Sequence, residues 1–246
     1  MSGHSKWANI KHRKSKADAM KGKMFTRAAK EIINSVKLGG PDPKGNSRLR
    51  LALQKAREVN MPADNIERLI KKATSLDQEA YEEMQYELYG FGGVGIIVDV
   101  MCANKNRIAS DIRIATNKRG GTIAHPGAVS FNFERKGVIV VPKDKVIEEE
   151  LFALVTDAGA EDFTDVGDHF VITTGPGDLF HVKEAVSKLG FIPKDSAIEM
   201  VPKSYVECTL EHARSNLALI EWLEGIEDVD AVWHNMKIPD ELVPNS

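Results

Sequence analysis

The order of apolar and polar positions predicts three short helices near the start of the chain. Apolar residues, beginning with Met24 and Phe25, recur at spacings of three and four over 24–36, the pattern of one buried helical stripe. A second helix is predicted over 47–59, and a third from Pro62, because proline suits a first helical turn. Short amphipathic helices with brief connections pack into a bundle. The pattern therefore predicts a helical domain over residues 1–75.

After the helical region the pattern changes to that of strands. Residues 84–89 and 95–103 have strand length and alternation, and the GFGG segment near them is typical of a hairpin turn. A helix is predicted to begin after an Asn104 cap and to lead to the strand AVSFNF at 128–133. This is a strand, helix, strand unit with an extra strand in front.

Residues 137–202 have the order β-α-β-β-α-β, which predicts a ferredoxin-like sandwich with its helices on one face of an antiparallel sheet. The segment SYVECTL at 204–210 is predicted as a strand, and a helix and a last strand follow it. We expect these three elements to join those of 94–133 and to complete a second β-α-β-β-α-β arrangement. The predicted fold class is α+β, with a basic helical domain at 1–75, a discontinuous middle domain at 76–135 plus 204–246, and an inserted ferredoxin-like domain at 136–203.

Charge divides the chain unevenly. Residues 1–72 contain 18 Lys and Arg against 6 Asp and Glu, whereas residues 73–246 contain 15 against 30. The net charge of −3 therefore hides a basic first part and an acidic remainder. Such asymmetry indicates a nucleic-acid partner for the basic part. An acidic remainder repels phosphate, so the nucleic acid should contact the first domain.

The candidate nucleic-acid-binding residues are cations, two histidines and one tryptophan, most of them in the first thirty residues. The competing interpretation is a solvated Lys-rich tail, and Trp7 could stack on a base or cover the core of the bundle. We expect the first two dozen residues to contribute little to any core, because they contain few apolar positions. The candidates are His4, Lys6, Trp7, Lys11, His12, Arg13, Lys14, Lys16, Lys21, Lys23, Arg27, Arg48 and Arg50.

The sequence predicts neither a cofactor nor a metal site. Gly90, Gly92 and Gly95 satisfy G-x-G-x-x-G, but a strand follows them where a dinucleotide site needs a helix N-terminus. No two of the seven histidines have the i, i+4 spacing of a metal-binding helix. Cys102 and Cys208 are expected to be buried thiols. The acidic residues accompany no nucleophile pattern, so we expect a protein that is not an enzyme.

Apolar runs in the sequence are shorter than the roughly 20 residues of a membrane span. The basic N-terminus lacks the apolar segment of a secretory signal. We therefore expect a cytoplasmic protein with no membrane partner and no small-molecule substrate.

Several motifs are more specific than composition. They are GHSKWANIKHRK at 3–14, LGGPDPKGNSRLR at 38–50, NMPADNIERLIKKA at 60–73 and VWHN at 232–235. On these motifs the chain resembles the YebC/PmpR family, which includes the mitochondrial translational activator of cytochrome c oxidase, and the similarity spans the whole chain. The chain departs from the family pattern in YELYGFGG, where Leu88 and Phe91 replace Gly and Pro.

The resemblance implies a cytoplasmic, non-enzymatic protein with a helical first domain and two α+β domains around a cleft. It implies either a DNA-binding transcriptional regulator or a ribosome-associated, RNA-binding translation factor that assists the synthesis of difficult sequences such as proline-rich stretches. The partner would be promoter DNA in the first case and ribosomal RNA in the second. The helices show no evident helix-turn-helix, and a Lys-dominated surface favours phosphates over base edges, so the residues alone favour recognition of RNA by shape over sequence-specific DNA binding. Both alternatives stay open at this point.

Overall fold

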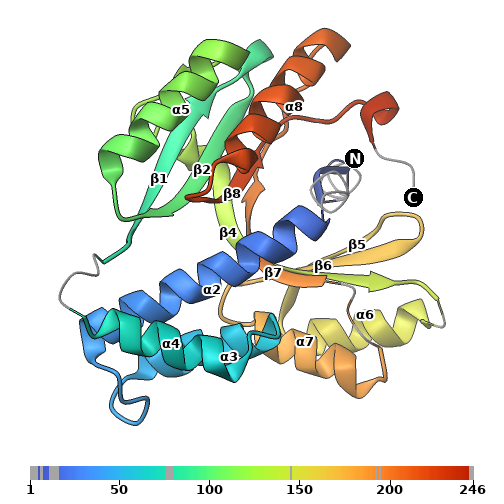
Figure 1. Cartoon of the computed structure of the whole chain (residues 1–246). Helices are drawn as coiled ribbons and strands as arrows, with labels where there is room; N and C mark the ends of the chain where they lie inside the picture. The colour runs from blue at the N-terminus through green and yellow to red at the C-terminus, as the bar shows by residue number, and fades with distance from the viewer. Residues whose placement is uncertain are drawn as a thin grey trace.

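The computed structural model describes residues 5, 8–10, 17–75, 80–144, 146–191, 193 and 195–243, without the side chains of 17–21. This part of the chain forms a helical bundle and two four-stranded antiparallel sheets (Figure 1). The predicted α+β class is confirmed. No helix in the described ranges is long and apolar enough to cross a bilayer.

The bundle consists of α2 (Ala17–Gly39), α3 (Ser47–Glu58) and α4 (Ala63–Ala73). Its core contains Ile32 and Leu49, and Phe25 packs against it as predicted. Met24 was expected on the same stripe, but it is 52% exposed. The Asn46 side chain accepts a hydrogen bond from Leu49 N at 3.0 Å and so caps the N-terminus of α3.

One sheet, which we call the second sheet, contains β4 (Phe133–Pro142), β5 (Ala160–Asp165), β6 (His169–Thr174) and β7 (Asp195–Pro202). Two helices cover one of its faces, α6 (Glu148–Asp157) and α7 (Leu179–Lys188). The strand order is β5-β6-β4-β7, and every pair is antiparallel. The predicted β-α-β-β-α-β sandwich is therefore present in this part of the chain.

The other sheet, which we call the first sheet, contains β1 (Glu82–Tyr89), β2 (Gly95–Cys102), β3 (Thr122–Ile123) and β8 (Val229–His234). It is covered by α5 (Lys105–Arg119) and α8 (Leu210–Gly225), and its order is β3-β1-β2-β8. A short 3-10 turn, η1 (Phe91–Gly93), joins β1 to β2, so the hairpin predicted at the glycines is confirmed. Cys102 is buried at this sheet, whereas Cys208 is only half-buried.

Two of the strands predicted for the first sheet are wrong. Residues 128–132 form a turn and a 3-10 helix, and 204–210 contribute only an isolated bridge between Val206 and Met236. The positions expected for these strands are occupied by β3 and by β1, the strand predicted to lie in front of the set. The sheet thus keeps the ferredoxin-like spatial order with different strands in two of its places.

The physical reason for the missing strand at 128–133 is the carboxylate of Glu87. It accepts hydrogen bonds from the backbone N–H groups of Gly127, Val129 and Ser130, at 2.7, 2.6 and 2.8 Å. N–H groups that point to one carboxylate cannot also join a sheet ladder. Burial alone would raise the pKa of Glu87, but these three donors hold it below its ordinary value. Glu87 therefore fixes a turn where the sequence predicted a strand.

The first residues of the chain contact both sheets, contrary to expectation. Ile10 is 2% exposed and packs against Val138, Val140 and Val171 of the second sheet. Ala8 packs against the core of the first sheet. The expectation that the first two dozen residues contribute little to a core is therefore wrong at these two positions. It failed because an isolated apolar residue forms no periodic pattern, and the partners of Ile10 lie more than 120 residues away along the chain.

The bundle and each sheet have a buried cluster of their own. The boundaries of the three predicted domains stay a prediction, because burial alone does not set them.

Candidate nucleic-acid interface

The structure describes only some of the predicted nucleic-acid-binding residues. His4, Lys6, Trp7, Lys11, His12, Arg13, Lys14 and Lys16 lie outside the described residues. Lys21 lies in α2, and its side chain is not described. Lys23, Arg27, Arg48 and Arg50 are described, so these four show how the basic surface of the bundle is used.

Lys23 points into the protein rather than toward a partner. Its Nζ donates hydrogen bonds to the carbonyl oxygens of Glu224 and Ile226 at the C-terminus of α8, and to Val229 O at 3.0 Å. The last carbonyls of a helix have no partner within the helix and carry partial negative charge, so a cation stabilises them. Burial lowers the pKa of Lys23, although Glu224 and Asp230 act in the opposite direction. Lys23 therefore holds α2 against α8.

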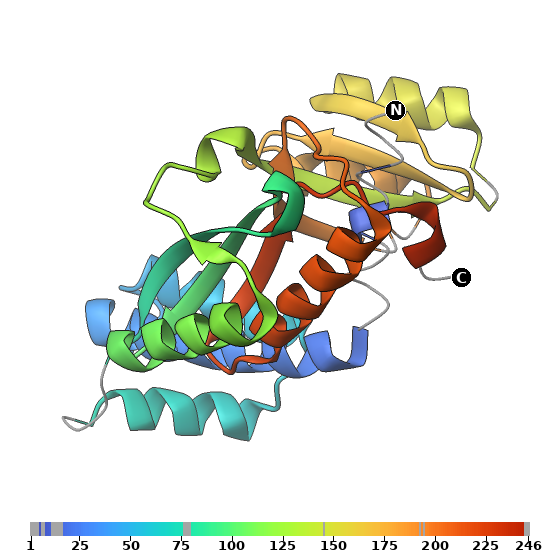
Figure 2. The ribbon, with the colours of Figure 1, turned by 90° about the horizontal axis from the view of Figure 1, so that it is seen from above.

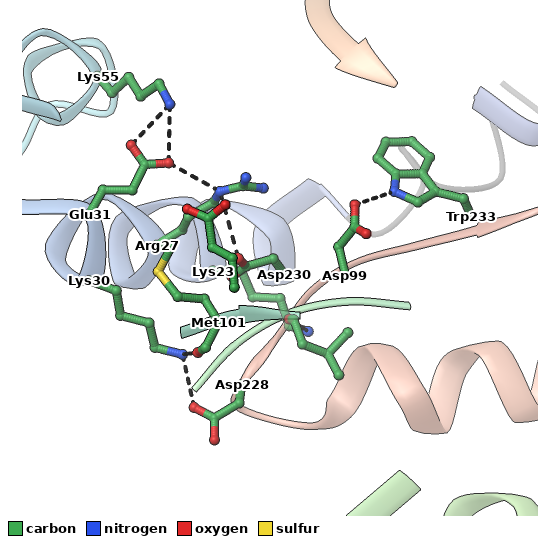
Figure 3. Close-up of polar contacts among 12 residues, drawn as sticks. Lys23, Arg27, Lys30, Glu31, Lys55, Asp99, Met101, Asp228, Asp230 and Trp233 are labelled. Carbon is green, nitrogen blue, oxygen red and sulfur yellow. Dashed lines mark hydrogen bonds and ion pairs between the residues drawn. The ribbon is translucent and has the colours of Figure 1, made fainter. Parts of the chain in front are cut away.

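Arg27 lies one turn further along α2 and faces two acidic groups. Its Nε is 3.4 Å from Glu31 Oε1 and 3.7 Å from Asp230 Oδ2, and 44% of its side chain remains exposed. Burial raises the pKa of the Asp230 carboxyl, and the positive charges of Arg27 and Lys30 oppose that shift. Figure 3 shows Arg27 between the Glu31 and Asp230 carboxylates. Only part of this guanidinium is available to a phosphate.

Lys30 is the most deeply buried cation at this contact, and it was not among the predicted residues. Its Nζ donates to Met101 O at 2.7 Å and to Asp228 Oδ1 at 2.9 Å (Figure 3), and the Tyr81 ring centroid lies 5.5 Å away. The side chains of Lys30 and Asp228 are only 7% and 5% exposed. A buried cation with a carboxylate, a carbonyl and an aromatic ring as neighbours is a fully paired charge.

A second cation reaches the same carboxylate from the opposite side. Arg107 on α5 forms an ion pair with Asp228 Oδ2, while Lys30 binds Oδ1. Burial alone would raise the pKa of Asp228, but the hydrogen bonds from Arg107 and Lys30 hold it below its ordinary value. Asp228 thus joins the bundle, the first sheet and α5 at one point.

These inward-facing residues share a stripe of α2 that the sequence shows only in outline. Lys23, Arg27, Lys30 and Asn34 follow one another at spacings of four, three and four, so they lie on one face of the helix. Asn34 completes the stripe, because its side chain exchanges hydrogen bonds with the main chain of Tyr81 at 2.6 and 2.7 Å. Polar residues also occupy other faces of α2, so periodicity alone could not separate docked from exposed side chains.

The two predicted residues of α3 lie at the surface. Arg48 is 3.5 Å from Glu83, and its side chain is 54% exposed. Arg50 donates to the carbonyl oxygens of Pro43 and Lys44, at 2.7 and 3.1 Å, and so stabilises the loop before α3. An exposed ion pair of this kind contributes little to stability and can exchange its partner. Both side chains remain accessible.

The bundle also exposes cations that were not among the predicted residues. Arg57, Lys71 and Lys72 are exposed on α3 and α4, and within the described ranges none of them forms an ion pair. The apolar stripes of α3 and α4 face the core of the bundle, and these cations lie on the solvent-facing sides of the two helices. The helical spacing could have identified them, because Arg57 and Lys72 are next to the buried Ala56 and Ala73, and Lys71 is next to the partly buried Ile70. They extend the candidate interface along the outer side of the bundle.

A cleft of about 250 Å³ lies where α2 meets both sheets. Arg27 and Arg135 line it together with Glu83, Asp99 and Asp230. Asp99 accepts hydrogen bonds from Gln85 and from Trp233 Nε1, at 2.9 and 3.0 Å. The acidic groups make this cleft unsuitable for a phosphate. Across the described ranges, no cluster of three or more His, Cys, Asp or Glu residues could hold a metal ion.

A family model described as the TACO1/YebC protein N-terminal domain matches residues 5–76, and one described as the TACO1/YebC second and third domain matches residues 81–236. These matches confirm the resemblance drawn from the motifs.

Similar proteins align over nearly the full length. The chain is 67% identical over 242 residues to probable transcriptional regulatory protein pc1328 of Protochlamydia amoebophila (strain UWE25), which covers 98% of this chain and 99% of that protein. It is 55% identical over 237 residues to probable transcriptional regulatory protein CTL0717 of Chlamydia trachomatis serovar L2, covering 96% and 100%. The crystal structure of a conserved hypothetical protein, Aq1575 from Aquifex aeolicus, superposes with a TM-score of 0.78 at 42% identity, covering 97% and 99%.

Proposed function

The chain belongs to the TACO1/YebC family, and we propose that it is a nucleic-acid-binding transcriptional regulator that contacts DNA through its helical bundle. The observation that carries this proposal is the division of the bundle's cations into two sets. Lys23 and Lys30 are used to dock α2, whereas Arg57, Lys71 and Lys72 stay exposed and free of ion pairs within the described ranges. Two relatives that share more than half of its residues are named as probable transcriptional regulators.

The chemistry of the exposed set supports contacts to the phosphate backbone. Lys and Arg side chains on short helices can neutralise phosphates and release counterions, which supplies most of the sequence-independent affinity for duplex DNA. Phosphate contacts set the register of a protein on DNA but do not read bases. We therefore propose that the bundle supplies affinity, and that it acts by binding rather than by catalysis.

The basic arm at 1–16 extends the same proposal, although most of it lies outside the described residues. It contains five cations, Lys6, Lys11, Arg13, Lys14 and Lys16, and no carboxylate. Because the arm carries no acidic side chain, its positive charge is not balanced within its own sequence. We propose that it adds further phosphate contacts to those of the bundle.

The experiment that tests this function is nucleic-acid binding by the full chain. A variant with Lys11, Arg13, Lys14 and Lys16 replaced by Glu should lose on the order of 100-fold in affinity for duplex DNA, because several phosphate contacts are removed. Fluorescence anisotropy would measure the affinity, and circular dichroism would check the fold. Unchanged affinity at moderate salt contradicts the assignment of the arm.

The choice between DNA and RNA needs a separate measurement. Crosslinking in cells, followed by sequencing of the recovered nucleic acid, should yield promoter DNA if the proposal is right. Recovery of ribosomal RNA at one site would replace it with the translation-factor alternative. Recovery of neither would contradict nucleic-acid binding as the function.

A further inference from the structure

Helix α5 is basic, whereas the part of the chain that follows residue 72 is acidic overall. It carries five of the fifteen Lys and Arg residues that follow residue 72, but only one of the thirty Asp and Glu residues, Asp111. The part of the chain around it is acidic, so this helix is a local exception. Such a concentration of positive charge is usually a solvated face.

The two ends of α5 use their cations in different ways. At the N-terminal end, Lys105 pairs with Glu82 and Arg107 pairs with Asp228, so carboxylates of the protein balance both charges, although each cation is more than half exposed. Toward the C-terminal end, Arg113 and Lys118 are exposed, and neither forms an ion pair in the part of the chain that the structure describes. The buried face of α5, which includes Ile108 and Ile112, holds these cations on the outer side.

An exposed aromatic ring contacts the last residue of α5. The guanidinium of Arg119 is 5.1 Å from the centroid of the Trp222 ring on α8, and Trp222 is 37% exposed. Ile114, also on α5, is 47% exposed. A half-exposed indole under a guanidinium presents a flat, positively charged surface, which is the kind of surface on which nucleic-acid bases and sugars stack.

The helix dipole explains only part of this arrangement. Lys118 and Arg119 are in the last turn of α5, where cations stabilise the helix C-terminus. Arg113 lies well before that turn, and neither Ile114 nor the exposed Trp222 follows from a dipole. Some of this surface is therefore left without a role in the fold.

We propose that the outer side of α5, with Arg113, Lys118 and the Arg119–Trp222 pair, is a second contact surface for the nucleic acid that binds the bundle. The inference rests on the proposed function and extends it to the first sheet. Figures 1 and 2 show α4 and α5 both toward the left of the molecule, with α5 at the top and α4 at the bottom of Figure 1, so one elongated partner can reach both helices. A phosphate backbone matches both sets by charge.

The test compares two variants with the same change in charge. Arg113→Glu/Lys118→Glu alters the proposed surface, and Lys183→Glu/Lys188→Glu alters α7 on the second sheet. Affinity for a fluorescent duplex of about 25 base pairs would be measured by anisotropy at fixed salt. We expect the α5 variant to bind roughly 10-fold more weakly and the α7 variant to change by less than about 2-fold, because only the first removes phosphate contacts.

The possible outcomes distinguish a failure of the α5 contact surface from a failure of the proposed nucleic-acid-binding function. An equal loss in both variants would show a general charge effect and overturn the α5 surface. If the α5 variant binds normally while the arm variant loses affinity, the surface is wrong and the proposed function stands; an acidic protein partner for α5 predicts this same result. If wild-type protein binds neither duplex DNA nor RNA, the proposed function fails first. Arg113→Gln/Lys118→Gln, expected to weaken binding about 3-fold, replaces the reversal should it misfold.

Discussion

Helices α2 and α5 are both rich in Lys and Arg, yet the protein uses them for different purposes. In α2 the cations Lys23 and Lys30 turn inward and bind main-chain carbonyls and the Asp228 carboxylate. In α5 the cations Arg113 and Lys118 turn outward. The two helices meet at Asp228, which Lys30 and Arg107 bind together. Positive charge along a sequence therefore indicates a partner only after the cations paired within the fold have been set aside.

What separates the two groups of cations is the presence of a buried acceptor. The C-terminus of α8 presents unpaired carbonyls to Lys23, and the loop after α8 presents Asp228 to Lys30. Both acceptors come from residues about 200 positions further along the chain. A cation with no such acceptor stays in water, where a phosphate can reach it.

Among the changes that test the contrast between inward and outward cations, removal of the charge of Lys30 should have the largest effect on stability. Lys30→Met leaves Asp228 buried with only Arg107 as a charged partner, so we expect a loss of about 3 kcal/mol in the free energy of unfolding. Lys55→Met is the matched control, because Lys55 also pairs with a carboxylate, that of Glu31, but is 58% exposed. We expect that control to cost less than about 1 kcal/mol. Urea unfolding measures both.

Equal losses for the two Lys→Met variants would contradict the distinction between docked and exposed cations. If Lys30→Met lowers the free energy of unfolding but the folded variant binds duplex DNA with unchanged affinity, the distinction is supported, because the docked charge should not touch the partner.

The contributions of Asp228 and Asp230 to stability should depend on pH in opposite directions, and this effect should be smaller than that of Lys30→Met. The pKa of Asp228 is lowered in the fold, so its ionisation stabilises the protein fully above the ordinary value of 3.8, and this contribution is lost as the pH falls through the lowered pKa. The pKa of Asp230 is raised, so its ionisation destabilises the fold at neutral pH, and the penalty disappears as the pH falls through the raised pKa. Thermal unfolding from neutral pH to about pH 3 would measure both contributions.

The two Asp→Asn variants make this test specific. The stability difference between wild type and Asp228→Asn should shrink as the pH falls, whereas the difference between wild type and Asp230→Asn should change in favour of wild type. Parallel pH profiles for the two variants would contradict the assigned environments.

Much of the fold could be predicted because it follows from local periodicity. The stripe from Phe25 to Ile33 defined the first helix of the bundle, and the order of elements over 137–202 gave the whole second sheet. The first sheet was only partly predictable. Glu87 fixes the turn at 127–130 from forty residues away, and no local pattern marks such a bond.

The candidate interface was less predictable than the fold, for the same physical reason. Lys23 and Arg27 look like members of the basic arm, and only the positions of α8 and Asp230 show that they face the protein. Lys71 and Lys72 were not selected, although their exposure follows from the helical spacing of α4. Side-chain charge can be read from a sequence, whereas the partner of that charge is set by tertiary structure.

The most direct test of the account is the salt dependence of duplex binding, measured for wild type, Arg113→Gln/Lys118→Gln and Lys30→Met. If about six phosphates are neutralised, the logarithm of the affinity of wild type should fall with the logarithm of salt concentration at a slope of about −5. The α5 variant should have a slope shallower by about 2, because two outward cations are removed, and Lys30→Met should keep the wild-type slope. A shallower slope for Lys30→Met together with an unchanged slope for the α5 variant would contradict the account.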